Sequence, residues 1–316
     1  MAVTDTHVQP GGRVLVTSVN GSIGSNIASN FLHLGYTMRG TEAFAERHPK
    51  SNFEKIVIPD VNCEGAYETA LNEVQGIVHV ARDMSFGTDP NQIIRQCQEE
   101  LTSSNRAAFD PILGKEIVIQ IRAGLWNQSA IKGAWAPPPY DASCMWDVES
   151  QVEQEILSFT KRSQRFVINL VLPGFMVSPI FYPKQTDSTG KWGMDFWRDP
   201  GHYEPLHSFI PPWFVDIDDM ALLHVAALTQ GDAKNMRLWA FADTFNFNNW
   251  VGVFRKLEPK KPWPSDDPIQ GHDLNKIDTS REVELLERFE KAGWTGLFDK
   301  CTHRRCRIVT STYTKM

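Results

Sequence analysis

The chain has 316 residues, a formal net charge of −6 and a pI near 5.9; 41% of its residues are hydrophobic and 22% are charged. This length and composition are typical of a globular protein with one large domain or two closely associated ones. The negative charge argues against a nucleic-acid partner or a membrane surface, because both need a basic footprint. No apolar run reaches the roughly 18 residues of a membrane helix, and the N-terminal segment does not resemble a signal peptide, so we expect a cytoplasmic protein.

The cysteines are odd in number and scattered, which argues against a disulfide framework. They are Cys63, Cys97, Cys144, Cys301 and Cys306. Cys301, His303 and Cys306 could ligate a metal ion, but they lack a fourth ligand at a recognisable spacing. We therefore predict no metal site and an irregular solvated tail from Lys300 onward.

In chain order, the first half alternates short β-branched runs with helical patterns. This alternation is typical of a parallel sheet that helices cover on both faces. We expect strands at 13–17, 38–41, 55–60 and 76–81, and helices near 23–34, 64–74 and 91–108. After residue 108 the alternation becomes less regular.

In the second part, EIVIQI could form a strand before the proline-rich segment AWAPPPY. We expect helices at 147–161, 217–229, 246–257 and 281–291, and strands at 165–173 and 237–241. Aromatic residues and prolines are frequent beyond residue 173. The sequence predicts an α/β protein with a Rossmann-type doubly wound parallel sheet, in which a dinucleotide-binding-like domain (1–173) interleaves with a smaller substrate lobe (174–316).

The segment VLVTSVNGSIGSNIASNFLHLGY places glycines directly after a strand and at the start of a helix. Backbone amides and the helix dipole favour a pyrophosphate at such a turn. The spacing is that of G-x-x-G-x-x-G, with Ser18 in place of the first glycine and with Gly21 and Gly24 retained. A turn that needs glycine only for close packing, and binds nothing, is the alternative.

From this turn to GWTGLFD, the chain resembles the extended short-chain dehydrogenase/reductases, specifically the dihydroflavonol-reductase-like aldehyde and ketone reductases of filamentous fungi. The similar segments include YTMRGT, IVIPDVNCEGAYETAL, GIVHVARDMSFGTDPNQII, LVLPGFMVSPI, PPWFVDIDDMALLHVAAL and WAFADTFNFNNWVGVFRKL. The resemblance implies a Rossmann-type fold, an NADPH site and a carbonyl substrate.

The resemblance also implies which residues would hold the cofactor. The turn residues Ser18, Gly21, Ser22, Ile23 and Gly24 would face the pyrophosphate. Asp60 with Val61 would lie near the adenine, Val80 with Ala81 near the ribose, and Arg39 near the 2′-phosphate. Relatives usually have a second arginine, whereas this chain reads Thr41-Glu42-Ala43, which replaces a cation by a carboxylate. We therefore expect NADP at a weakened site, or no cofactor.

Family members carry a Thr-Ser-Ser run and a Tyr-x-x-x-Lys pair, which together protonate the substrate carbonyl during hydride transfer. Here no Thr-Ser-Ser is found after the expected fifth strand, and Gln120, Ile121 or Arg122 would occupy the serine position. Relatives read W-D-V-Y-x-A-S-K where this chain reads WDVESQ. Aligning the flanks deletes the tyrosine and places Glu149 at the lysine, whereas an ungapped alignment places Met145 at the tyrosine.

Tyr140 in YDASC is one letter away from a Tyr-x-x-x-Lys pair, with Cys144 at the lysine position. It corresponds to a second tyrosine that relatives have in their A-P-P-P-Y turn. We interpret Tyr140 as this turn residue, and its recruitment as a displaced proton donor is the alternative.

Three hypotheses for function follow. The first is a biosynthetic enzyme of fungal-type secondary metabolism that carries out a non-redox step on an apolar intermediate, such as a Diels–Alder-type cyclisation, an isomerisation or a dehydration. The second is an NADPH-dependent carbonyl reductase with displaced catalytic residues. The third is a non-catalytic partner protein that keeps the fold.

Candidate site residues can be assigned to two groups. The acid/base candidates are His202, His207, Asp147, Glu149 and Arg122, with histidine preferred because it titrates nearest neutrality. Glu149 could equally be a solvated residue at a helix N-terminus. Aromatic residues indicate a large apolar substrate, although core packing explains any single one of them as well. They are Trp126, Trp146, Phe175, Trp197, Tyr203 and Trp213.

Overall fold

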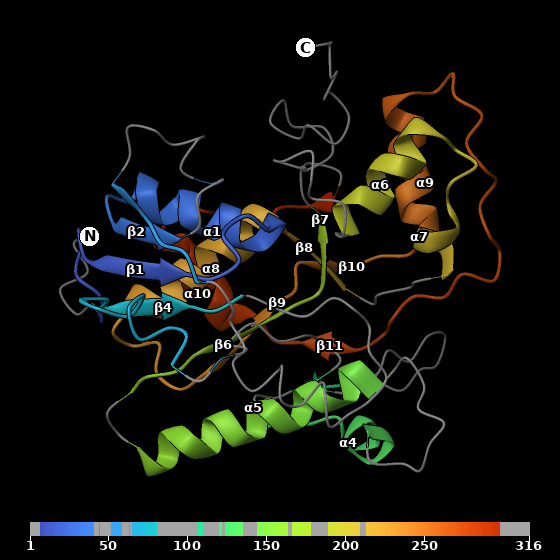
Figure 1. Cartoon of the computed structure of the whole chain (residues 1–316). Helices are drawn as coiled ribbons and strands as arrows, with labels where there is room; N and C mark the ends of the chain where they lie inside the picture. Colours follow the sequence, from blue (N-terminus) through green and yellow to red (C-terminus); the bar gives the residue numbers. More distant parts are fainter. Residues whose placement is uncertain are drawn as a thin grey trace. The chain divides into compact units, whose positions relative to one another are not determined.

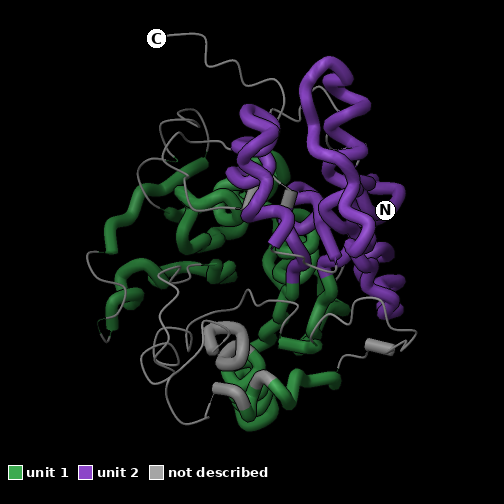
Figure 2. The backbone as a smooth tube through the Cα atoms, turned by 90° about the vertical axis from the view of Figure 1, so that its right-hand side faces the viewer, with its two compact units in different colours: residues 1–110, 123–172, 221–239 green, residues 111–122, 173–220, 240–316 purple. Residues whose placement is uncertain are grey.

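The computed structural model, drawn in Figure 1, describes residues 7–40, 44, 52–58, 63, 65–80, 107–109, 120–121, 124–134, 144–163, 166–177, 189–208 and 213–297. No helix within these ranges is long and apolar enough to cross a membrane. Two compact units make up the chain, one from residues 1–110, 123–172 and 221–239 and the other from residues 111–122, 173–220 and 240–316 (Figure 2). The expected boundary at residue 173 stays a prediction.

Unit 1 contains a four-stranded sheet with the order β3-β2-β1-β4, in which every neighbouring pair is parallel. Its strands are β1 (Arg13–Val16), β2 (Thr37–Gly40), β3 (Phe53–Lys55) and β4 (Gly76–Val78). Helix α1 (Ser22–His33) connects β1 to β2 and buries Ile27, Ala28 and Phe31. A strand, a glycine turn, a helix and a parallel second strand form the dinucleotide-binding arrangement. The Rossmann-type α/β fold is therefore confirmed.

The rest of unit 1 contains α4 (Gln128–Ala134), α5 (Cys144–Arg162), most of α8 (Ile217–Thr229), and the paired strands β6 (Leu170–Pro173) and β9 (Arg237–Ala240). Helix α5 begins three residues earlier than expected. The helix expected at 64–74 is wrong, because residues 65–73 form successive turns. Most of the backbone bonds there join residues three apart, such as Glu68 N to Gly65 O, rather than four apart.

Unit 2 contains a three-stranded sheet of β7 (Phe175–Val177), β8 (Trp213–Asp216) and β10 (Asp243–Thr244), with the order β10-β8-β7. A short parallel pair joins β5 (Gln120–Ile121) to β11 (Lys276–Ile277). The helices of unit 2 include α6 (Thr189–Arg198), α7 (Glu204–Ser208), α9 (Phe247–Leu257) and α10 (Ser280–Glu287).

An aromatic cluster forms the core of unit 2. Phe196 of α6 and Phe254 of α9 are fully buried, with ring centroids 5.4 Å apart, and Trp250 packs 5.3 Å from Phe254. Asn246 fixes the start of α9 through a capping box with Asn249. Many aromatic residues of this part of the chain therefore pack into a hydrophobic core.

Candidate functional site

The glycine turn after β1 keeps its specialised backbone although its first glycine is replaced. Ser18 has a φ of 50° and its carbonyl accepts a hydrogen bond from Gly21 N at 2.8 Å. This left-handed region suits glycine, and a residue with a Cβ atom pays about 1 kcal/mol to occupy it. Ser18 therefore adopts the left-handed conformation that a glycine would adopt at this position, and the turn keeps this backbone shape without the glycine.

Gly24 allows α1 to pack directly on this turn. A Cβ atom at Gly24 would lie 2.4 Å from the Ser18 carbonyl oxygen and 2.8 Å from its carbon, which are backbone atoms that cannot move aside easily. Gly21 is the N-cap of α1 and makes no side-chain cap hydrogen bond, and the helix begins with Ser22 and Ile23. First-turn amides have no partner inside their own helix, so this end of α1 fits an anion such as a pyrophosphate.

A buried polar pair joins the carboxyl ends of β1 and β4. Thr17 Oγ1 accepts a hydrogen bond from Val80 N at 2.9 Å and lies 3.1 Å from His79 Nδ1. Burial lowers the pKa of His79 to about 4, so the imidazole is neutral at physiological pH. The pair holds the backbone at Val80, one of the expected ribose residues. Sequence reasoning missed Thr17 and His79, although each is a polar residue directly after an apolar strand.

The other expected cofactor residues are only partly described. Arg39 lies in β2 and forms an ion pair with Glu54 at 2.8 Å. Asp60, Val61 and Ala81 lie outside the described residues. The role of Arg39 at a 2′-phosphate stays a prediction.

Helix α5 covers the segment in which we expected the Tyr-x-x-x-Lys pair of the family. Its sequence, CMWDVESQVEQEILSFTKR, contains no tyrosine, and its lysine, Lys161, lies in the last turn. Ser150 Oγ donates to Ala107 O at 2.7 Å, and Glu153 forms a buried ion pair with Arg237 at 2.8 Å. These two polar side chains therefore hold the helix in unit 1. The side chains of Trp146, Asp147 and Glu149, and all of Arg122, lie outside the described residues.

The two candidate histidines differ in their surroundings. His207 Nε2 lies 2.8 Å from Asp267 Oδ2, and 32% of the His207 side chain is exposed. A backbone hydrogen bond from Ile269, followed by the bond from His207, lowers the pKa of Asp267 below its ordinary value. A carboxylate at this distance can orient the imidazole ring. His202, in contrast, has 71% of its side chain exposed, and its Nδ1 lies 3.2 Å from Asp199 Oδ2.

The expected substrate-binding aromatic residues do not form one described group. Phe175, Trp197 and Tyr203 belong to the aromatic cluster of unit 2, and Phe175 is only 4% exposed. Trp213 packs 5.9 Å from Phe241, and its indole nitrogen is buried without a hydrogen-bond partner among the described residues. Trp126 lies in unit 1 under the guanidinium of Arg237, at 4.1 Å.

No family model matches the chain. It is 42% identical over 333 residues to the NAD-dependent epimerase/dehydratase terH of Aspergillus terreus, a match that covers 95% of this chain and 97% of the relative. It is 34% identical to the NAD-dependent epimerase/dehydratase tndE of Aspergillus flavipes, over 95% of this chain and 94% of the relative. It is 30% identical to aldehyde reductase 2 of Sporidiobolus salmonicolor, over 94% and 96%.

Solved structures show the same fold at lower identity. Gre2 from Candida albicans matches with a TM-score of 0.74 and 19% identity, over 91% of this chain and 95% of that chain. Vestitone reductase from alfalfa matches with a TM-score of 0.63 and 16% identity, over 91% and 95%. The similarities extend over nearly the whole length of each pair of chains.

Proposed function

The chain belongs to the extended short-chain dehydrogenase/reductase family, and from this membership we propose that it is an enzyme of fungal-type secondary metabolism that acts without net oxidation or reduction. The proposed reaction is a cyclisation such as a Diels–Alder-type reaction, an isomerisation or a dehydration of an apolar intermediate. The names of the two relatives described as epimerase/dehydratases support a reaction of this kind.

The observation that carries this proposal is the composition of α5. Hydride transfer to a carbonyl needs a proton donor beside the carbonyl oxygen. Neither α5 nor any other part of the chain contains a tyrosine that lysine follows four residues later. We infer from this that the usual donor pair of the family is missing, whereas the turn that would hold a cofactor keeps its geometry.

A nicotinamide dinucleotide is the cofactor that fits the turn. We propose that Ser18, Gly21, Ser22, Ile23 and Gly24 hold its pyrophosphate and that Val80 lies beside its ribose. Gre2 from Candida albicans is described in complex with NADPH. Such a cofactor, when bound, supplies hydride chemistry. In this protein we propose that it is held without net hydride transfer.

His207 is the proposed proton-transfer residue. Asp267 orients its ring, and partial burial keeps it from full solvation. Removal of a positioned general acid or base slows a reaction by about 10²–10⁴-fold. We expect this loss of turnover for His207→Asn and a nearly unchanged rate for His202→Asn, the exposed matched control. Equal effects of the two substitutions would contradict the assignment.

A carbonyl reductase with displaced catalytic residues is the second candidate, because aldehyde reductase 2 is 30% identical. The third, a non-catalytic partner, would give no turnover at all. Deletion of the gene in its organism distinguishes them. The accumulated intermediate should be an isomer of the next metabolite or differ from it by one water. A difference of two hydrogens would favour the reductase. Co-purification with another biosynthetic protein, without turnover of any pathway intermediate, would favour the partner protein.

A further inference from the structure

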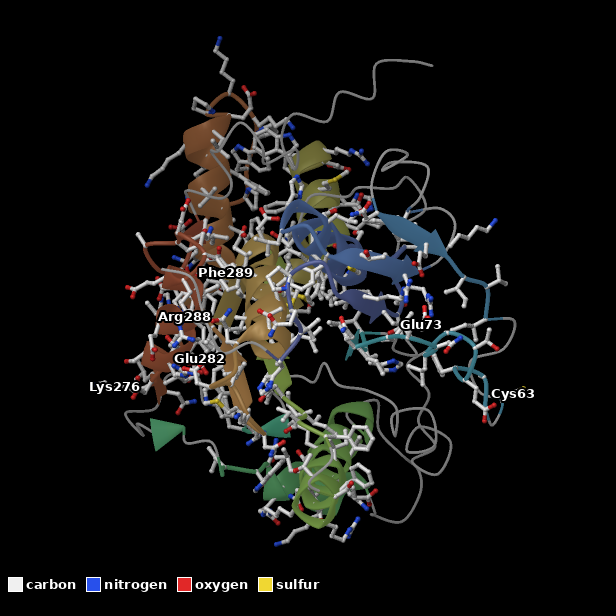
Figure 3. All side chains as sticks on the ribbon, turned by 90° about the vertical axis from the view of Figure 1, so that its left-hand side faces the viewer. Cys63, Glu73, Lys276, Glu282, Arg288 and Phe289 are labelled. Carbon is white, nitrogen blue, oxygen red and sulfur yellow. The ribbon has the colours of Figure 1, made fainter. Side chains whose placement is uncertain are left out.

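Three apolar side chains lie exposed together where α5 ends and the chain leads into β6. Phe159, in the last turn of α5, and Phe166 and Val167, before β6, are 44%, 57% and 43% exposed. The two phenylalanine rings stack, with centroids 6.2 Å apart and an angle of 26° between their planes. Side chains project from α5 at the lower edge of Figure 3. Single exposed apolar residues are ordinary, whereas a contiguous group such as this apolar patch marks an interaction site.

Hydrogen bonds fix the backbone beside the apolar patch. Ile168 N donates to Asn235 Oδ1 at 3.1 Å, and Asn169 Nδ2 donates to Ala233 O at 2.8 Å. Thr160 of α5 is only 4% exposed, so the helix packs on unit 1 through a face beside the patch and not through the patch itself. The patch is therefore part of the folded surface and is not an unfilled part of the core.

Basic residues surround the apolar patch. They are Lys161, Arg162, Arg165 and Lys234. Lys161 and Arg162 are exposed in the last turn of α5, and Lys234 is exposed in the loop that accepts the two hydrogen bonds just described. No ion pair within the described part of the chain includes Lys161, Arg162 or Lys234. The exposed acidic residues near them in the chain are Glu155 and Asp232, so positive charge is in excess.

An anionic membrane surface fits this combination better than a protein partner does. A stable protein interface buries about 800 Å² on each side, which is more than three apolar side chains supply. Lipid binding needs only apolar side chains that enter the headgroup boundary and cations that meet anionic lipids. The net charge of −6 belongs to the whole chain. Because charges more than about 10 Å away are largely screened at about 0.1 M salt, the local excess of cations governs this contact.

We propose that the apolar patch and the cations around it bind the surface of an anionic membrane. Phe159 and Phe166 enter the boundary between headgroups and acyl chains, and Lys161, Arg162 and Lys234 contact the lipid phosphates. The binding is peripheral and reversible, because each cation strengthens it only about fivefold and few apolar side chains take part. This inference is independent of the proposed function, although an apolar intermediate would partition into the same membrane.

Sedimentation of the purified full-length protein with lipid vesicles tests the proposal. With vesicles of equal parts phosphatidylcholine and phosphatidylserine, we expect binding in low salt that is lost at about 1 M salt, where the Debye length is about 3 Å. Vesicles of phosphatidylcholine alone should bind more than about tenfold more weakly. Phe166→Ser should weaken binding to the mixed vesicles about tenfold through lost apolar burial. Lys161→Glu should do so about tenfold by replacing an attraction with a repulsion.

Two substitutions in unit 2 are matched controls, because they make similar chemical changes outside the apolar patch. Ile269→Ser removes a side chain of a residue that is 88% exposed, and Lys260→Glu reverses the charge of an exposed lysine. Neither should change vesicle binding. Thermal unfolding of each variant identifies a folding defect. Lys161→Glu alters an exposed side chain, so it tests the proposal even if Phe166→Ser fails to fold.

The remaining outcomes contradict the proposal. Absence of binding to the mixed vesicles in low salt would overturn it, and so would equal losses in the patch and control variants. Sedimentation velocity without lipid tests a second copy of the chain as the occupant. If the protein self-associates, and Phe166→Ser abolishes this association but leaves vesicle binding unchanged, the patch is an interface between copies and the membrane assignment is wrong.

Discussion

At the residue scale, two helical glycines differ in the space that surrounds them. A Cβ atom on Gly24 would collide with the backbone of Ser18, whereas one on Gly252 in α9 would meet nothing within 4 Å. We expect Gly24→Ala to lower the free energy of unfolding by about 1–3 kcal/mol through overpacking. Gly252→Ala should raise it by about 0.5–1 kcal/mol, because alanine favours a helix interior. Denaturant unfolding of both variants checks this, and a neutral Gly24→Ala would contradict the close packing of α1 on the turn.

The buried histidine at the end of β4 predicts a pH dependence. The ordinary pKa of His79 is 6.5, and burial lowers it to about 4 in the folded chain. Between these values the unfolded chain binds the proton and the folded chain does not, so the contribution of His79 to stability falls as the pH falls. The full loss is about 3 kcal/mol. It should be complete near pH 4.

His79→Asn removes this titration. Its unfolding free energy should therefore vary less between pH 6.5 and 4 than that of the unsubstituted protein. Parallel pH slopes for the two proteins would show that His79 is not held neutral by burial.

At the scale of elements, α5 is anchored by a buried ion pair. Glu153 and Arg237, with side chains 3% and 1% exposed, join α5 to β9. Removing one partner of a buried pair costs about 3–5 kcal/mol, because the other charge is left uncompensated. We expect this loss of stability for Glu153→Ala. Gln151→Ala on the same helix, which removes an exposed contact with Glu155, should change stability by less than about 0.5 kcal/mol.

The elements also show what the sequence could predict. The apolar runs at β1, β2 and β4 and the glycine turn were sufficient to predict a parallel Rossmann-type sheet, because hydrophobic periodicity and turn chemistry are local signals. The same logic failed at residues 65–73, where a helical pattern forms turns instead. Local patterns carry no information about the tertiary bonds that override them.

The candidate site was predictable only in part for the same reason. The position of Ser18 in the motif could be seen, but its positive φ could not. The pairing of Arg39 with Glu54 depends on the parallel register of β2 with β3, which places the two residues side by side. The contact of His207 with Asp267 joins residues 60 positions apart. None of these contacts leaves a signal in a single sequence.

At the scale of the whole molecule, the glycine turn keeps the geometry of a dinucleotide site, whereas the sequence contains no Tyr-x-x-x-Lys pair. The central claim is that the protein acts on an apolar intermediate without net hydride transfer. The two halves of the claim are separable, because binding of a dinucleotide and transfer of its hydride are measured independently. Methylglyoxal and isovaleraldehyde, substrates named for the yeast Gre2 reductase, provide simple carbonyl probes for the second half.

The most direct test incubates the purified protein with the intermediate that accumulates on gene deletion, and with NADH and NADPH that carry deuterium at the nicotinamide C4. Mass spectrometry then follows the product. We predict an isomer or a dehydrated product without deuterium, and no oxidation of either dinucleotide with the two carbonyl probes. A product that gains deuterium while the dinucleotide is oxidised would contradict it and identify the protein as a reductase.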